Sequence, residues 1–452
     1  MTTDTGPLLP ALPAAVRSLL DDLRGAGQAA YLVGGSLRDS LLGRVPSDWD
    51  LTTDARPERI QAIFPGSLYE NRFGTVVVRR DGVACEITTF RRDFASPDHR
   101  HPERVEFGET IDEDLARRDF TVNAMAWGGP PAGEPAFVDM FGGRADLERR
   151  LLRAVGDPDA RFEEDALRMV RAVRLAATLG FAIEAGTLAA IGRNAALARF
   201  LSGERIAAEL ERLLAAPAPS AGLRLLGETG LLAVIAPELA RQPGIPQGKK
   251  GVSDLWEHTL RTVDAVPAGR RSLRLAALVH DIGKPSTFAD GHFHHHDVEG
   301  ARLAAEWLGA LHFPRAVVER VAHLVRHHMF AYEPRWTDAS VRRLIRRVGP
   351  AAVEDLIALR EADNVGSGLA PDAGHLAELR ARCAGQLAAR VALGRGDLAL
   401  DGHDLMAALD LEPGPRLGWL LDALTERVVA EPALNERERL LETARAILAE
   451  EG

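Results

Sequence analysis

Strand-like patterns are confined to the first third of this chain of 452 residues, and this limits the folds open to it. Short β-branched apolar runs occupy 29–35, 49–53 and 74–90, and the last is divided by Asp81-Gly82, a strong hairpin signal. Beyond about residue 160, apolar residues recur at helical spacing instead. We therefore expect an α+β fold in which a mixed-sheet head precedes an elongated, all-helical remainder.

Composition narrows the class of protein. Fifty-five basic against 65 acidic residues give a net charge of −10, which excludes a uniformly basic nucleic-acid coat but allows a local basic groove. Two cysteines cannot build a disulfide framework or a cysteine-rich zinc site. The chain has no run of 18 apolar residues and does not begin like a signal peptide, so we expect a cytoplasmic protein without a membrane partner.

A glycine pair and two aspartates form the first chemical motif. Asp48 and Asp50 are two apart on an expected strand, so they share a face and repel each other unless a cation lies between them. Oxygen ligands of this kind select Mg²⁺, which supports phosphoryl or nucleotidyl transfer. Upstream, the turn at Gly35 lets the backbone approach phosphate, and Arg38 adds positive charge. The alternative is a surface turn with two solvated aspartates.

The run GGSLRDSLLGRVPSDWDLTT resembles the signature of the DNA polymerase β nucleotidyltransferase superfamily. Within it, the chain is similar to class II tRNA nucleotidyltransferases (CCA-adding enzymes) and to bacterial poly(A) polymerases, strongly over 28–215 and more loosely elsewhere. This implies template-independent addition of CCA, or of its terminal A, to tRNA 3′ ends from CTP and ATP. It also implies Mg²⁺ held by Asp48 and Asp50.

Further roles follow from the resemblance. Glu86, in CEITTF, matches the family's acidic position and would accept the proton of the attacking hydroxyl, although an exposed strand glutamate is equally open. RRDFTVNAM at 117–125 matches the family motif in which Arg118 contacts phosphate and Asp119 with Asn123 selects ribose. Asp119 can also cap a helix start.

The next match, EDxxR at 164–168, implies base recognition. Asp165 and Arg168 are three apart, so on a helix they would project from one face and mimic the Watson–Crick edges of C and A. A surface ion pair is the alternative. We expect Arg171 to contact triphosphate or RNA, and Arg174, roughly opposite Asp165, is a further candidate.

Three other stretches indicate which branch of the family the chain resembles. FEEDALR, at 162–168, is the tRNA-repair version of a motif that reads YREDPVR in poly(A) polymerases. Residues 91–105 resemble the flexible loop kept by members that add the terminal A, with Phe94 or Ala95 replacing its tyrosine. GERIAAEL, from 203, resembles a neck helix of structural residues.

A second set of motifs lies in the helical remainder: WEHT, LVHDIGKP, HHHD, RHH and EAD. Their order and spacing resemble the HD phosphohydrolase superfamily, whose histidines and aspartates suit Mn, Ni, Fe or Zn. The resemblance implies four core ligands of a transition metal: His258, His280, Asp281 and Asp363. It also offers candidates for a second metal and a phosphate contact: His296, His327, His328 and Lys284.

We therefore expect four parts: a catalytic head (1–150), a helical neck for base recognition and RNA binding (151–245), an HD domain (252–365) and a helical tail (366–452). Arginines at 342, 343, 346 and 347 face either RNA or solvent. The rival functions are a poly(A) polymerase, an HD phosphohydrolase with an RNA-binding head, and a non-catalytic RNA scaffold. The sequence leaves open full CCA against A-only addition, and the oligomeric state.

Overall fold

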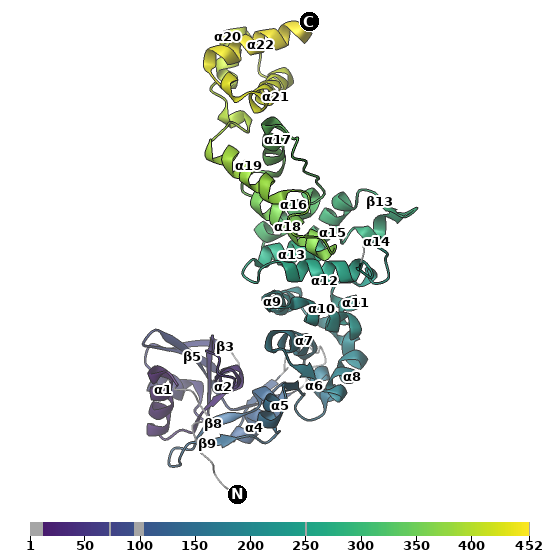
Figure 1. Ribbon diagram of the computed structural model, residues 1–452. Helices are drawn as coiled ribbons and strands as arrows, with labels where there is room; N and C mark the ends of the chain where they lie inside the picture. The colour runs from purple at the N-terminus through teal and green to yellow at the C-terminus, as the bar shows by residue number, and fades with distance from the viewer. Residues whose placement is uncertain (1–11, 72–73, 95–103, 249–250, 452) are drawn as a thin grey trace. The chain divides into compact units, whose positions relative to one another are not determined.

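The computed structural model of the protein describes residues 12–71, 74–94, 104–248 and 251–451. The chain divides into two compact units, residues 1–240 and 241–452. Figure 1 shows the large sheet in the purple and blue part of the chain and helices from teal to yellow. The expected α+β organisation, a mixed-sheet head followed by helices, is confirmed.

The first unit contains a seven-stranded mixed sheet. Only β2 and β5 run parallel, while the other neighbouring strands pair antiparallel. In spatial order the strands are β3 (Leu68–Asn71), β4 (Thr75–Arg80), β5 (Val83–Thr89), β2 (Trp49–Thr53), β1 (Ala30–Val33), β8 (Ala126–Gly129) and β9 (Ala136–Val138). The parallel pair lies in the middle of the sheet, where it carries the acidic residues of interest.

The expected strands at 29–35, 49–53 and 74–90 are present as β1, β2 and the β4–β5 hairpin. Asp81 and Gly82 both have positive φ, 50° and 77°, as the tight hairpin turn requires. Strands β3, β8 and β9 escaped the sequence analysis because they are short. The stretch 91–105, expected as a loop, begins and ends in paired strands, β6 (Arg91–Phe94) and β7 (Arg104–Phe107); Ala95 lies outside the described residues.

Helices complete the first unit. The amphipathic helix α1 buries Val16, Leu19 and Leu23, which lie three and four residues apart. The helices up to residue 240 are α1 (Ala14–Gly25), α2 (Gly34–Leu41), α3 (Pro57–Ile63), α4 (Ile111–Ala116), α5 (Gly143–Glu148), α6 (Pro158–Glu164), α7 (Leu167–Leu179), α8 (Ala185–Asn194), α9 (Gly203–Leu214), α10 (Pro219–Glu228) and α11 (Leu231–Ile235). Two-residue strands β10 (Leu151–Leu152) and β11 (Ala182–Ile183) pair among them.

The second unit is helical apart from the short hairpin of β12 (Phe288–Ala289) and β13 (His292–Phe293). Its helices are α12 (Leu255–Ala265), α13 (Arg271–Val279), α14 (Lys284–Thr287), α15 (His296–Ala310), α16 (Arg315–His327), α17 (Asp338–Val348), α18 (Val353–Gly366), α19 (Leu376–Ala388), α20 (Gly402–Leu409), α21 (Pro415–Ala430) and α22 (Arg437–Glu451). Within the described ranges, no helix has the length and apolar character needed to cross a membrane.

The arginines of α17 join helices of this unit. Arg342 is buried and donates to the carbonyl of Val429 at 2.7 Å and to Gln386 at 2.8 Å. Arg343 and Arg346 form ion pairs with Glu426 of α21. These three arginines therefore hold α17 against its neighbours; the buried Arg342 faces neither RNA nor solvent, whereas Arg343 is solvent-exposed, as one of the two alternatives expected.

Candidate functional site

Asp48 and Asp50 lie at the start of β2 beside a cavity of about 460 Å³. Trp49 and Leu51 are buried in the strand, so Asp50 is directed to the opposite face. Asp48, immediately before the strand, is exposed and accepts a hydrogen bond from Ser47. Both aspartates line the cavity, as the alternation along the strand predicts.

Burial raises the pKa of Asp50; the Arg118 guanidinium opposes this effect and the neighbouring Asp48 adds to it. A divalent cation between the two carboxylates would lower the pKa of Asp50, because it favours the charged forms of both groups. The donor set consists of carboxylate oxygens, which fits Mg²⁺. The residues present therefore fit the metal that the motif implies.

Gly34 lets two charged groups approach each other. Its φ is +70°, and a Cβ at this position would lie 3.0 Å from Arg118 Nη1 and 3.1 Å from Asp50 Oδ2. At Gly35 a Cβ would lie 3.5 Å from Arg38 Nη2, which is ordinary contact. Sequence reasoning named Gly35, which does line the cavity, but the steric requirement is at Gly34.

Glu86 lies across from Asp50 on the adjacent parallel strand, with the two residues in register. In-register neighbours share a face of the sheet, so their side chains project to the same side. Glu86 is also exposed. Both descriptions offered for it, a carboxylate beside the metal ligands and an exposed strand glutamate, agree with this position, and its catalytic role stays a prediction.

Arg38, Asn123, Asp119 and Arg171 form a continuous chain. Arg38 donates to Asn123 Oδ1 at 2.6 Å, Asn123 donates to Asp119 at 3.0 Å, and Arg171 donates to Asp119 at 2.7 Å. Although burial opposes it, the charge of Arg171 and the Asn123 hydrogen bond hold the pKa of Asp119 well below its usual range. The structure thus unites the predicted phosphate and ribose contacts.

The helix-cap role expected for Asp119 is wrong. The element that follows is a 3₁₀ turn, Thr121–Asn123, whose N-cap is Phe120 and which has no side-chain cap. Asp119 instead accepts from the backbone N–H of Phe120 and from the Asn123 side chain. Its carboxylate is therefore oriented by a local bond and by Arg171.

Asp114 is a functional candidate that the sequence analysis missed. This carboxylate is fully buried in α4 and accepts from Arg117 at 2.6 Å and Arg118 at 2.9 Å. Although burial opposes it, these two arginines lower the pKa of Asp114 to about 2. The available signal was the spacing of three and four residues in IDEDLARR, which places both arginines on the face of Asp114.

The expectation that Asp165 and Arg168 project from one face of a continuous helix is wrong. Helix α6 ends at Glu164, Asp165 is extended with φ −152°, and α7 begins at Leu167. The Asp165 carboxylate accepts from the Leu167 N–H at 3.0 Å, and this local side-chain bond competes with continuation of α6; the N-cap of α7 is Ala166.

Asp165 and Arg168 also do not form the alternative ion pair with each other. Asp165 pairs with Arg205 of α9 at 2.7 Å. Arg168 is buried, pairs with Glu164 at 2.7 Å and donates to the carbonyl of Arg117 at 2.9 Å. Both are held by neighbours that orient them.

The cavity beside Asp48 and Asp50 has a basic wall. Arg174 pairs at 2.6 Å with the buried Glu209, which also binds Arg212 at 3.2 Å. Sequence reasoning missed two of the arginines that line the cavity, those at 44 and 212. The predicted residues in its lining are Gly35, Arg38, Asp48, Asp50, Asn123, Arg171 and Arg174, whereas Glu86, Arg118, Asp119, Asp165 and Arg168 lie outside it.

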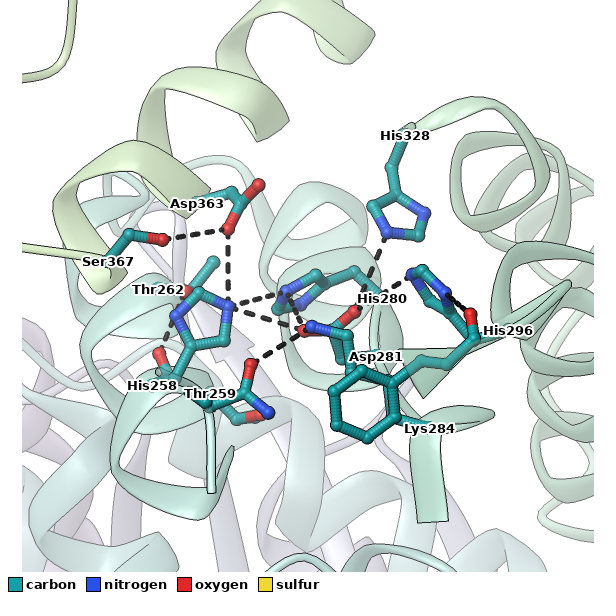
Figure 2. A network of polar contacts seen from close by, with 12 residues as sticks. His258, Thr259, Thr262, His280, Asp281, Lys284, His296, His328, Asp363 and Ser367 are labelled. Carbon is teal, nitrogen blue, oxygen red and sulfur yellow. Dashed lines mark hydrogen bonds and ion pairs between the residues drawn. The ribbon is translucent and has the colours of Figure 1, made fainter. Parts of the chain in front are cut away.

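The four ligands predicted in the second unit converge. His258 Nε2 on α12 lies 3.0 Å from His280 Nε2, 3.4 Å from Asp281 Oδ2 and 3.2 Å from Asp363 Oδ1 on α18. All four side chains are buried. Figure 2 shows the rings and carboxylates turned toward a common point.

A second cluster shares Asp281. Its Oδ1 lies 3.5 Å from His296 Nε2 and 3.6 Å from His328 Nε2. In both histidines Nδ1 bonds a backbone carbonyl, and Nε2 is buried without a hydrogen bond in the described structure. His327, the third candidate, is not in this cluster: its ring packs on His323 with 4.6 Å between centroids.

The protonation states of this centre suit a metal. Burial lowers the pKa of His280 and of His296, which favours neutral imidazole. Although burial opposes it, His280 and Lys284 hold the pKa of Asp281 well below its usual range. The ligand atoms of each cluster lie within 4.8 Å of one another, so this donor set fits two divalent cations with Asp281 between them.

Comparisons with known proteins cover both units. Residues 30–153 match the "Poly A polymerase head domain", and residues 233–366 match the "HD domain". A CCA-adding enzyme of Geobacillus kaustophilus is 35% identical over 93% of this chain and 94% of its own length. One of Limosilactobacillus fermentum is 34% identical over 97% and 98%. The crystal structure of the Bacillus stearothermophilus CCA-adding enzyme in complex with CTP is 32% identical, has a TM-score of 0.73, and covers 97% of this chain and 98% of its own.

Proposed function

Since the chain belongs to the family of CCA-adding enzymes, we propose that its head adds CCA to the 3′ ends of tRNA, using CTP and ATP without a nucleic-acid template. The observation that carries the assignment to residues is the row of carboxylates at Asp48, Asp50 and Glu86 on β2 and β5, with a cavity lined by arginines beside it. Acidic metal ligands next to a basic triphosphate site are what nucleotidyl transfer requires.

In this mechanism the 3′-hydroxyl oxygen of the RNA bonds to the α-phosphorus of the nucleotide, and pyrophosphate leaves. Asp48 and Asp50 would hold Mg²⁺, which would supply charge neutralisation at the phosphates. Glu86 or Asp50 takes the proton of the attacking hydroxyl. Arg38, Arg171 and Arg174 hold the triphosphate, and they remain ordered because Asn123, Asp119 and Glu209 bind them.

Selection of ribose and base uses groups that already have partners. Asp119 accepts from the Phe120 N–H and from Asn123 through Oδ1, and from two N–H groups of Arg171 through Oδ2. Its four lone-pair positions are therefore occupied, and a ribose 2′-hydroxyl would bind by replacing one of these donors. Arg205 and Glu164 orient Asp165 and Arg168 for the base. We expect the base to bind at their remaining lone pairs and N–H donors.

The test is to incubate purified protein with tRNA transcripts that end before CCA, after CC, or complete, and with CTP and ATP singly and together. We expect C, C and A to be added in order and addition to stop at A. Addition of A only to the CC-ended tRNA would indicate an A-only enzyme. Long A tails on an unrelated oligonucleotide would indicate the poly(A) polymerase alternative.

A second activity is favoured by the buried histidine–aspartate centre. We propose that the region 252–365 binds a transition metal, Mn, Ni, Fe or Zn, through His258, His280, Asp281 and Asp363, and hydrolyses phosphate esters. Metal analysis of purified protein, followed by assays on phosphomonoesters and 2′,3′-cyclic phosphates, tests this. Protein without bound transition metal after supplementation would contradict it.

We also propose roles for the other two parts of the chain. The neck at 151–245 reads the base and binds RNA, and the tail at 366–452 contacts tRNA. Residues 180–242 match the "Probable RNA and SrmB- binding site of polymerase A", which supports RNA binding by the neck. A cytoplasmic location is proposed because tRNA maturation provides the substrate there.

A further inference from the structure

A run of histidines on the β12–β13 hairpin lies outside the buried metal centre. Residues 292–296 read HFHHH, in a chain that holds 14 histidines in all. His292, His294 and His295 are exposed, whereas His296 is buried and belongs to the second cluster. Three imidazoles at this hairpin are therefore open to solvent.

The hairpin presents different residues on its two faces. Phe293 stacks on its cross-strand partner Phe288, with 5.0 Å between ring centroids, and Lys284 Nζ lies 5.2 Å from the Phe293 centroid. Successive side chains of a strand point to opposite faces, so His292 and His294 share the other face. The aromatic face packs inward, and the histidine pair occupies the outer face.

The two exposed rings lie at the spacing of metal ligands. The centroids of His292 and His294 are 5.7 Å apart. The corresponding distance is 5.1 Å for the two histidines of the first buried cluster and 5.3 Å for those of the second. Exposed side chains can close such a difference by a small rotation, so both rings can reach one cation.

The nitrogens of this pair are also available. Across the part of the chain that the structure describes, neither His292 nor His294 has a hydrogen bond or an ion pair. The other close pair of exterior histidines, on α16, differs: His323 lies 4.6 Å from His327 between centroids, but its Nε2 is 2.6 Å from the Val348 carbonyl. The hairpin pair therefore offers two imidazoles without competing partners.

The exposed pair is coupled to the buried centre through the backbone. The Phe293 carbonyl, between the two exposed histidines, bonds His296 Nδ1 at 2.9 Å. His294 and His296 are two residues apart, which limits their Cα separation to about 7 Å. His296 and Asp281 are only 7% and 2% exposed, so a hydrated cation must lose water to reach them. A cation held by the exposed pair would wait within one or two residues of that ligand.

We propose that His292 and His294 bind a divalent transition metal, Cu²⁺, Ni²⁺ or Zn²⁺, on the outer face of the hairpin, and that this exposed site loads the buried cluster through His296. Imidazole suits these metals, and water completes the shell. With no enclosing protein geometry, the affinity should be highest for Cu²⁺, as the general order of divalent metals requires. The loading role rests on the proposed metal centre of 252–365, whereas binding by the pair does not.

Binding is tested on full-length protein whose buried centre has first been filled with Zn²⁺. Cu²⁺ is titrated in and followed by electron paramagnetic resonance, and the retained Zn²⁺ is measured afterwards. We expect one Cu²⁺ with nitrogen hyperfine structure from two imidazoles. His292→Ala or His294→Ala should each weaken it by about 100-fold or more, because the second ligand no longer binds intramolecularly.

The matched control is His295→Asn. It removes an exposed histidine of the same run that has no ring contact within the described ranges, and asparagine tolerates the φ of 56° at this position. This variant should bind Cu²⁺ as the wild type does. Unchanged binding in both alanine variants, or an equal loss in His295→Asn, would overturn the site.

Loading is tested by the rate at which metal-stripped protein takes up limiting Zn²⁺. Zinc that survives a brief chelator wash is counted as buried. The double variant His292→Ala with His294→Ala should fill about 10-fold more slowly, because the local metal concentration falls, but reach the wild-type content. Equal filling rates would overturn the loading role. Wild type that retains no zinc after the wash would instead contradict the buried centre, and the Cu²⁺ titration would still decide on the exposed pair.

Discussion

The head and the HD region at 252–365, here called the body, both gather aspartates, but the two environments shift the carboxylate pKa values in opposite directions. In the head, burial raises the pKa of Asp50, and the nearby Arg118 does not overcome this effect. In the body, adjacent histidines and other polar neighbours lower the pKa of Asp281 and of Asp363, although burial opposes both shifts. A cation between Asp48 and Asp50 would oppose the upward shift of the Asp50 pKa, whereas the pKa values of Asp281 and Asp363 are lowered by their protein neighbours alone.

This difference indicates how each site acquires its metal. Oxygen ligands beside an open, arginine-lined cavity suit Mg²⁺ that arrives with a nucleotide and completes its shell with phosphates. Buried imidazoles suit a resident transition metal, and three of them, His280, His296 and His328, are oriented by a backbone carbonyl at Nδ1. The two sites should therefore respond independently to mutation and to chelation.

The largest expected effect is loss of nucleotide addition in Asp48→Asn and Asp50→Asn. Each substitution removes a metal-ligating charge without changing side-chain volume, so the rate should fall by about a thousandfold or more. Quench-flow measurement of CTP incorporation checks this, with Asp21→Asn on the exposed face of α1 as control. Near-wild-type rates in both variants would refute the head assignment.

The body can be dissected by metal stoichiometry. His280→Ala should remove the metal of the first cluster, whereas His328→Ala should remove that of the second, because its ring reaches only the Asp281 Oδ1 side. His327→Ala is the matched control, since the ring of His327 packs on His323 and not in the cluster. Metal analysis of the three proteins decides. Equal loss in the variants at 327 and 328 would mean that the second cluster holds no metal.

Base selection should loosen in Asp165→Ala and Arg168→Ala. Each lost contact should reduce discrimination against UTP and GTP by about 1–3 kcal/mol. Competition between nucleotides on one tRNA measures this. Arg161→Ala, which loses an ion pair to the same Glu164, should keep the selectivity. A uniform loss of rate with all four nucleotides would place base recognition elsewhere.

Asp114 links stability to pH. Its pKa is about 2 in the folded chain against an ordinary value of 3.8, so its ion pairs stabilise the fold above about pH 4 and are lost as pH falls through about 2. The contribution is about 2 kcal/mol. Asp114→Asn should lower the free energy of unfolding near pH 7 and flatten its acid dependence. The control is Asp112→Asn, exposed on the same helix, and an identical acid profile in both variants would contradict this account.

The predictions that the structure confirmed rest on local sequence patterns. Alternation along β2 and the Asp81-Gly82 turn are properties of a few adjacent residues, and so is the buried face of a helix. The buried positions Val321, Leu324 and Val325 also predict that His328, rather than His327, follows on the inner face of α16. This helical spacing can be read from the sequence, but the sequence analysis did not apply it to choose between the two histidines.

What the sequence analysis predicted wrongly, missed or left open depends on contacts distant in sequence or on a competing local bond. Nothing near Asp165 reveals that Arg205 binds it, and the hydrogen bond that Asp165 accepts from the Leu167 N–H competes with helix continuation. Glu86 lies beside Asp50 because β5 pairs in parallel with β2, and no short motif encodes the register of that pairing. The steric need at Gly34 comes from Arg118, 84 residues away.

The most direct test of the central claim, that the head works with its own Mg²⁺ site independently of the body, is addition by protein stripped of transition metal. The wild type is treated with a chelator, its metal content is measured, and only Mg²⁺ is returned before CCA addition to tRNA is followed. We predict the full wild-type rate with no detectable transition metal. A rate that recovers only when Mn, Ni, Fe or Zn is restored would contradict the account.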